Sequence, residues 1–449
     1  MASRSSSAPK ATKAPLPNEI ISLIVEHLPR DDLSQARHVG KVFAAVAAPR
    51  LFETIPLWLG LRSLQALTQL SHHHQLRHCV KAIVFSPLRF VDHDREDEDE
   101  DEGEAEVAYL SRTRSRIRLS TDSSSLSELL FLKHRSAYHA FIDDQRNLTV
   151  DELDVSILTH AFEQLPKLEN IVLDHGNTTI GASLLHRELG PFDSADLLTC
   201  DCLHPLPVLL RAMATAGVEL RSFTIGMMPG FAACGSQTAS LLTRDGSWSH
   251  KSSRRPESID PKTLAKTFQD DDICPWHMFN HLRKFEIQEI ETDEEDIKAT
   301  HYLGVATSQL LEMASGLESV TIGRLGSLGS LGGDPQTPNL FVHKLFKGSP
   351  RSRLRHLDLS DLKAKHQSLV RFIRSQAPVL ELIFLRYIEL VDGTWSSALT
   401  KLRTTRFPAL RRFELHGCSD PGFQGDQEKS TFVTDYILRK TDDTPWVWK

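Results

Sequence analysis

A short motif that recurs along this 449-residue chain constrains its fold more than any other feature. The motif reads Leu, then Glu or Arg, then any residue, then apolar, any residue, apolar. The apolar spacing alone would arise about ten times by chance in a chain of this composition, but the required Leu and charge reduce that to about one or two. Seven copies therefore indicate a repeated unit. They begin at Leu168, Leu220, Leu282, Leu317, Leu354, Leu380 and Leu410, and a weaker eighth, VKAIVF, begins at Val80.

Each copy of the motif predicts a β-strand. Its apolar offsets 0, 3 and 5 cannot share one face of a helix, whereas offsets 3 and 5 lie on the same side of a strand. The stretches between copies contain helix-forming sequences at 151–165, 204–217, 297–315, 365–376 and 394–405. Strands that alternate with helices predict an α/β fold with a parallel sheet, stacked as a solenoid. A different α/β arrangement of these elements stays open.

The repeated unit resembles a leucine-rich repeat, in which a Leu-led turn enters each strand. The last five copies begin 35, 37, 26 and 30 residues apart, close to the roughly 20 to 29 residues of that family or modestly longer, whereas the earlier steps of 88, 52 and 62 residues require insertions. The Asn that such repeats place after the strand is missing, and residues such as Gly176, Met228 and Asp361 stand there. The resemblance implies an irregular array with a curved parallel sheet and outer helices.

The residues beside the core positions of each strand are expected to share the concave face of the sheet. Most are polar and of mixed charge, which favours a protein-binding surface over a phosphate-binding one. The predicted target-binding residues are Lys284, Glu286, His356, Asp358, Leu382, Phe384, Arg386, Arg412 and Glu414. Leu382 and Phe384 are apolar exceptions. Either they form a hot spot for a partner, or the C-terminal segment with Trp446 and Trp448 covers them.

The segment from Pro15 to Trp58 predicts three short helices. Asn18 is placed to cap the first helix, and Pro29 to end it. The apolar residues at helical spacing are Ile20, Leu23, Ile24 and Leu28 in the first helix, Leu33, Ala36 and Val39 in the second, and Phe43, Val46 and Ala47 before Pro49 in the third. Three helices in about 40 residues make a core below the size at which a lone domain is usually stable. We therefore expect this module to need a partner.

This module is similar to an F-box of the type common in fungal proteins. The resemblance rests on Leu16-Pro17-x-Glu19-Ile20-x-x-x-Ile24-x-x-x-Leu28, then Asp32-Leu33, then Val39-x-Lys41-x-Phe43, and on the ending Leu51 to Ile55. Gly40 departs from the family, which often has Cys there, and lowers helix propensity by about 1 kcal/mol.

The F-box resemblance implies that the first helix docks into the Skp-family adaptor of a cullin-RING ubiquitin ligase. On this chain the adaptor contact would fall on Leu16, Pro17, Ile20, Ile24, Leu28, Leu33 and Val39. The alternative is an ordinary N-terminal bundle whose apolar ridge packs on the rest of the chain, because a helix laid in a partner's groove and one laid on its own core share the same pattern.

The charge of the chain is concentrated in one segment. Residues 92–106 hold eleven acids and one base, a charge of -10, so the rest of the chain carries +3 (-7 minus -10). Such a run repels itself and is expected to be disordered. Arg112, Arg114, Arg116 and Arg118 follow it. Because they stand beside eleven acids, we expect the two halves of the insertion to attract each other rather than bind nucleic acid.

Signatures of catalysis and of cofactors are largely missing from the sequence. It contains no GxSxG, GxxxxGK[ST] or HExxH motif. Cys200, Cys202 and His204 could ligate zinc, but a second pair of ligands at the usual spacing is missing. We therefore expect a protein that is not an enzyme and holds no metal or cofactor. Six cysteines and no apolar run of membrane-spanning length favour the cytoplasm or nucleus and no membrane partner.

Together these features predict a tail at 1–14, the F-box at 15–58, a linker and first repeat at 59–91, the insertion at 92–125 and a leucine-rich-repeat-like region at 126–449. The predicted function is the substrate-recognition subunit of a Skp-cullin-F-box ubiquitin ligase that tethers a target protein for ubiquitination. The alternative is a scaffold of the same architecture that does not lead to degradation.

Overall fold

The computed structural model describes residues 16–90, 124–174, 188–189, 198–199, 204–226, 267, 276–288, 297–323, 342–346, 353–420 and 430–440. The chain divides after Thr54 into two compact units, and each is described by itself. The predicted N-terminal tail, nearly all of the predicted acidic insertion, the two C-terminal tryptophans and the cysteines at 200 and 202 lie outside the described residues.

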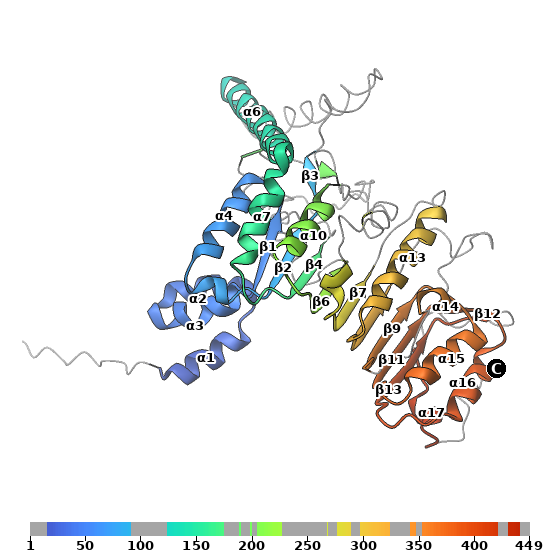
Figure 1. The fold of residues 1–449 in the computed structure, drawn as a ribbon. Helices are drawn as coiled ribbons and strands as arrows, with labels where there is room; N and C mark the ends of the chain where they lie inside the picture. The colour runs from blue at the N-terminus through green and yellow to red at the C-terminus, as the bar shows by residue number, and fades with distance from the viewer. Residues whose placement is uncertain are drawn as a thin grey trace, which may run out of the picture. The chain divides into compact units, whose positions relative to one another are not determined.

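Three short helices form the first unit (Figure 1). They are α1 (Asn18–His27), α2 (Arg30–Val39) and α3 (Lys41–Leu51). Pro17 and Pro29 directly precede α1 and α2, where a missing N–H costs nothing because the first helical N–H groups have no partner in the helix. Small and branched side chains meet between the helices, and the buried core is Ile21, Val25, Leu33, Ala36 and Ala47. The third helix continues past Pro49, where we expected it to end.

A ten-stranded sheet organises the second unit among the described residues. Its order is β1 (Thr54–Trp58), β2 (Ala82–Ser86), β4 (Asn170–Leu173), β6 (Ser222–Ile225), β7 (Lys284–Ile287), β8 (Ser319–Ile322), β9 (His356–Ser360), β11 (Leu382–Arg386), β13 (Arg412–His416) and β14 (Ser430–Phe432). The pairs from β2 to β13 are parallel and β14 is antiparallel. The predicted α/β fold with a largely parallel sheet is therefore confirmed.

The eight copies of the sequence motif become the eight strands from β2 to β13, in chain order. The register aligns them residue by residue, so that Ile171 pairs with Phe223 and Phe223 with Phe285. The residue that begins each copy is buried, and so are the apolar residues three and five positions later. Burying three apolar side chains per strand is the physical reason for the spacing of the motif.

The charge in the second position of the motif forms a ladder where the strands begin. Glu169 Oε2 lies 3.0 Å from Arg221 Nε, and Glu381 stands between Arg355 (3.3 Å) and Arg411 (3.5 Å). The backbone N–H of Arg221 donates to the Glu169 carbonyl at 2.7 Å, which extends the strand pairing by one residue. Opposite charges on neighbouring strands stabilise the pairing, each by up to about 1 kcal/mol.

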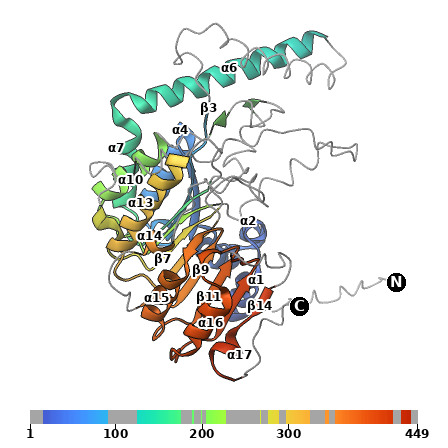
Figure 2. The same ribbon diagram turned by 90° about the vertical axis from the view of Figure 1, so that its right-hand side faces the viewer.

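The predicted helices lie between the strands. They are α7 (Leu153–Glu163), α10 (Pro205–Thr215), α13 (Ile297–Met313), α15 (His366–Gln376) and α16 (Trp395–Arg403). α7 packs on α10, and α15 on α16. Figures 1 and 2 show α13, α15 and α16 along one face of the sheet.

Some elements were not expected from the sequence. α4 (Leu61–His72) occupies part of the predicted linker, and α6 (Ser124–Thr149) is a helix of 26 residues. β3 (Arg89–Phe90) pairs antiparallel with β5 (Leu198–Thr199), and β10 (Lys363–Lys365) pairs parallel with β12 (Glu389–Asp392). The short helices α14 (Val342–Leu345) and α17 (Thr434–Ile437) complete the elements used below.

The last three long strands end in the same way. The residue directly after β9, β11 and β13 has a positive φ: 55° at Asp361, 51° at Tyr387 and 58° at Gly417. Left-handed backbone reverses the direction of the chain within one residue. The next residue in each copy, Leu362, Ile388 or Cys418, is buried. This turn leads the chain away from the sheet and toward the small β10–β12 pair and the helices.

Candidate functional sites: two interaction surfaces

Four large apolar side chains lie exposed on and just before α1, and we call them the α1 surface. Their exposed fractions are 52% for Leu16, 43% for Ile20, 51% for Leu23 and 39% for Ile24. Positions 16, 20, 23 and 24 recur at steps of three to four and share one side of a helix, whereas Ile21 and Val25 face the core. The helix is thus apolar on two sides, and only one of them is covered by its own unit.

The predicted adaptor-binding residues divide into an exposed and a buried group. Leu16, Pro17, Ile20 and Ile24 are exposed at α1, and Val39 is exposed at the end of α2. Leu28 is half-buried against the core of the unit, and Leu33 is 4% exposed within it. Leu33 therefore supports the helices from inside and offers no side-chain surface to a partner.

Leu23 is an exposed residue that the predicted adaptor set left out. Its helical spacing with Ile20 and Ile24 was visible in the sequence, but the spacing alone could not say which side of the helix is covered.

Three rows of side chains cross β7, β8, β9, β11 and β13, and we call them the polar face. The first row is Lys284, Ser319, His356, Leu382 and Arg412; the second is Glu286, Thr321, Asp358, Phe384 and Glu414; the third includes Ser360, Arg386 and His416. They alternate with the buried strand residues and so point to the opposite side of the sheet. All nine predicted target-binding residues belong to these rows.

The lysine and the two arginines of the polar face each pair with a carboxylate of the second row. Lys284 Nζ lies 2.6 Å from Glu286 Oε2, Arg386 Nη2 lies 3.3 Å from Asp358 Oδ2, and Arg412 pairs closely with Glu414. Burial raises the pKa of Asp358, and the Arg386 guanidinium opposes that shift.

The cations of these pairs are more exposed than the carboxylates. Side-chain exposure is 49%, 48% and 52% for the three bases, against 17%, 12% and 15% for the three acids. The acids therefore form the floor of the polar face, and the cationic groups extend toward solvent.

Phe384 lies at the centre of these charges. The guanidinium carbon of Arg386 lies 5.6 Å from the centre of its ring, and that of Arg412 lies 5.5 Å from it, within the range of a cation–π interaction. The His356 ring meets Phe384 edge-on at 5.7 Å. Phe384 and Leu382 are half-buried. The C-terminal tryptophans, which could cover these two residues, lie outside the described residues.

Two histidines and a tyrosine complete the polar face. His356 Nδ1 lies 3.2 Å from Ser319 Oγ, and burial lowers the pKa of His356. Tyr387 Oη lies 3.0 Å from His416 Nε2 on the next strand. Tyr387 was not predicted as part of this surface, because its position depends on the left-handed turn after β11, which an aromatic residue does not signal.

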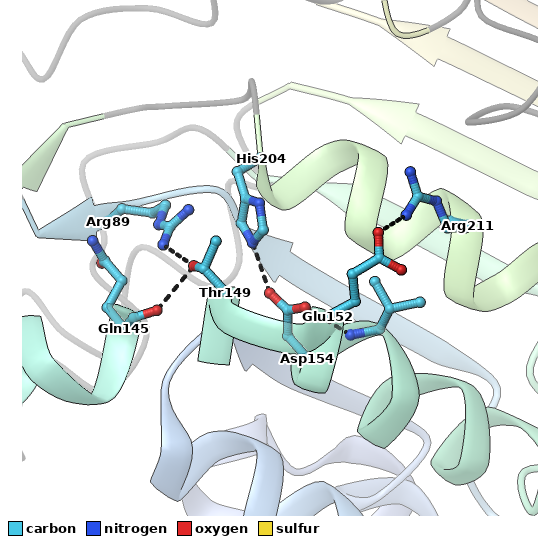
Figure 3. A network of polar contacts seen from close by, with 8 residues as sticks. Arg89, Gln145, Thr149, Glu152, Asp154, His204 and Arg211 are labelled. Carbon is cyan, nitrogen blue, oxygen red and sulfur yellow. Dashed lines mark hydrogen bonds and ion pairs between the residues drawn. The ribbon is translucent and has the colours of Figure 1, made fainter. Parts of the chain in front are cut away.

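A separate group of polar contacts includes two that join the start of α7 to α10 (Figure 3). Asp154 is buried at the start of α7, accepts from the N–H of Val155 at 2.8 Å and lies 2.7 Å from His204 Nε2 at the start of α10. Arg211 of α10 pairs with Glu152 at 2.6 Å. A carboxylate and a histidine in contact also occur in catalytic sites. Here Asp154 lies in the first turn of α7 and His204 directly precedes α10, so the contact ties two neighbouring helices together.

Metal and membrane sites are not found in the part of the chain that the structure describes. No group of three or more His, Cys, Asp or Glu side chains there could hold a metal ion, and no described helix is long and apolar enough to cross a membrane. No family model and no curated protein matches this chain.

Proposed function

We propose that this protein is the substrate-recognition subunit of a Skp-cullin-F-box ubiquitin ligase. The α1 surface would bind the Skp-family adaptor, and the polar face would hold a target protein. Catalysis by such a subunit is proximity: it raises the effective concentration of the target near the ubiquitin-charged enzyme and performs no bond chemistry itself.

The observation that carries this proposal is the exposed apolar side of α1. A helix of ten residues in a unit with a five-residue buried core leaves Leu16, Ile20, Leu23 and Ile24 in water. Exposed apolar clusters on small units favour partner binding, because covering them adds the burial that the unit lacks. The F-box resemblance of the same residues supports an adaptor as that partner.

We further infer that the second unit is an irregular leucine-rich-repeat array. When the repeat pattern L-x-x-L-x-L-x-x-N/C-x-L is laid on the copy that begins at Leu410, Cys418 takes the Asn or Cys position, while Phe413 replaces the second Leu and Asp420 the last. Counted in the same way, this position falls on Leu362 in the copy at Leu354, one residue beyond Asp361, and on Ile388 in the copy at Leu380, and both side chains are buried as well. Buried apolar side chains would replace the hydrogen bonds of the usual Asn. This substitution supports an irregular member of the family.

Binding of purified Skp-family adaptor to the purified full chain tests the proposal. The double variant Ile20→Asp with Leu23→Asp puts two charges on the α1 surface and leaves the core residues Ile21 and Val25 unchanged. We expect affinity to fall at least tenfold, because each carboxylate would be buried without a partner. Glu26→Ala, an exposed polar position of the same helix, is the matched control and should bind as the parent chain does.

Circular dichroism must show that both variants keep their helices. The proposal fails if the parent chain does not bind the adaptor, or if the folded double variant binds it as tightly as the parent.

A further inference from the structure

We infer that the polar face binds an acidic segment of the target, through carboxylate or phosphate oxygens that meet Lys284, Arg386 and Arg412. This inference rests on the proposed function, since it takes the polar face as the site where the target is held. It adds the chemistry of the partner, which the repeat architecture does not specify.

The first support is the direction of the three ion pairs. In each pair the cation is about half exposed and the carboxylate lies beneath it, so each pair is a small dipole with its positive end in solvent. An anion that contacts the cation at about 3 Å lies about twice as far from the carboxylate. Coulomb attraction then exceeds repulsion roughly twofold. A cationic partner at the same place would be repelled more strongly than it is attracted.

The second support is the preorganisation of the two arginines. Both guanidinium groups are held near the Phe384 ring, and each is also paired with an acid on the floor. A guanidinium fixed in this way presents the edge geometry that matches two oxygens of a carboxylate or phosphate. Less side-chain entropy is then lost when a partner binds.

The third support is the spacing of the cations along the rows. Lys284 and Arg412 stand in one row across five neighbouring strands. Four steps of about 4.8 Å separate them by roughly 19 Å, which an extended segment of about six residues spans at about 3.3 Å per residue. We therefore infer an extended acidic segment that crosses the strands, with Phe384 beneath the part of it nearest Arg412.

Nucleic acid is disfavoured as the anion. The three cations are matched by three carboxylates in the same rows, so the face carries no net formal charge from these six groups. A phosphate backbone is bound mainly through net positive charge over a long track.

The test measures fluorescence anisotropy of labelled peptides with the full chain at low salt. In every protein tested, residues 92–106 are replaced by a Gly/Ser stretch of equal length, which prevents competition from the chain's own acids. The acidic probe is a 12-residue peptide with six Glu, and its matched probe carries six Gln. A third peptide carries two phosphoserines in place of Glu. A 12-nucleotide single-stranded DNA is the fourth probe.

We expect the acidic or the phosphorylated peptide to bind at least tenfold more tightly than the Gln peptide and the DNA, and whichever binds identifies carboxylate or phosphate as the source. The double variant Arg386→Ala with Arg412→Ala should bind this peptide with an affinity at least tenfold lower than that of the parent. Its matched control, Arg355→Ala with Arg411→Ala, removes the same charge from the ladder outside the polar face and should bind as the parent does. Asp358→Asn should bind several-fold more tightly, because a repelling carboxylate is removed.

The inference is overturned if neither the Glu peptide nor the phosphorylated peptide binds more tightly than the Gln peptide. DNA binding as tight as that of the peptides, equal losses in the two arginine double variants, and unchanged binding by Asp358→Asn overturn it as well. Adaptor binding is measured on the α1 surface and does not involve these residues. A chain that binds the adaptor but no acidic probe would therefore reject this inference and leave the proposed function standing.

Discussion

His366 connects the fold to pH at the scale of a single residue. It is 5% exposed at the start of α15, its backbone N–H donates to Asp392 Oδ1, and its buried ring atom Nε2 makes no hydrogen bond. Burial lowers its pKa, Lys401 lowers it further, and Asp392 opposes the shift. The unfolded chain therefore binds a proton at a pH where the folded chain does not. Stability is lost as the pH falls through the unfolded value of about 6.5.

We expect the urea concentration at the unfolding midpoint of the parent chain to be lower at pH 5.5 than at pH 7.5. The difference should be smaller in His366→Asn. The substitution removes packing at both pH values, so only the difference between the two midpoints reports the proton. His356, whose pKa is also lowered, stays in both chains and cancels in the comparison. An equal pH dependence of parent and variant would contradict this assignment.

Among the elements, the strands from β2 to β13 were predictable because their motif repeats the same burial eight times. Five of the helices were predictable because they lie between the copies of the motif and carry apolar residues at helical spacing. α6 was not predictable in this way, because polar residues interrupt its buried side. Gln145 is buried there, and its side chain binds both backbone groups of Phe90 at 3.0 Å, a partner 55 residues away. No local pattern reveals such a partner.

In the candidate sites, too, the features that follow a local pattern were predictable, and those that depend on distant contacts were not. The alternation of each strand was enough to assign the nine predicted residues to the polar face, and their common register then brings them together. Their ion pairs and the position of Tyr387 depend on contacts between copies and on a left-handed turn. For the α1 surface, the sequence showed which residues are apolar but not that Leu33 is enclosed.

A pair of neighbouring substitutions in β11 tests the two sides of the sheet. Ile383 is fully buried and Leu382 is half-buried on the polar face. We expect Ile383→Ala to lower the free energy of unfolding by about 2 to 5 kcal/mol, since it leaves a cavity in the core. Leu382→Ala should lower the free energy of unfolding by about 1 kcal/mol. Denaturant titrations of both variants check this, and equal costs would show that the assigned sides are wrong.

At the scale of the whole molecule, the chain combines a small helical unit with a sheet whose strands follow chain order. In the part of the chain that the structure describes, each motif strand pairs with the strands before and after it in the sheet order, so each further copy from β7 to β13 adds a strand to the polar face. A surface built in this way extends over many strands, which suits an extended protein segment better than a small molecule. The α1 surface and the polar face belong to different units, so each can be altered without the other.

Quantitative mass spectrometry of complexes purified from cells with the proteasome inhibited tests the central claim most directly. The bait is the parent chain or the folded double variant Ile20→Asp with Leu23→Asp. We predict that the parent chain captures the Skp-family adaptor and a cullin, and that the variant loses both while it keeps the partners of the polar face. If the parent captures neither adaptor nor cullin, or if the variant captures both unchanged, the account is contradicted.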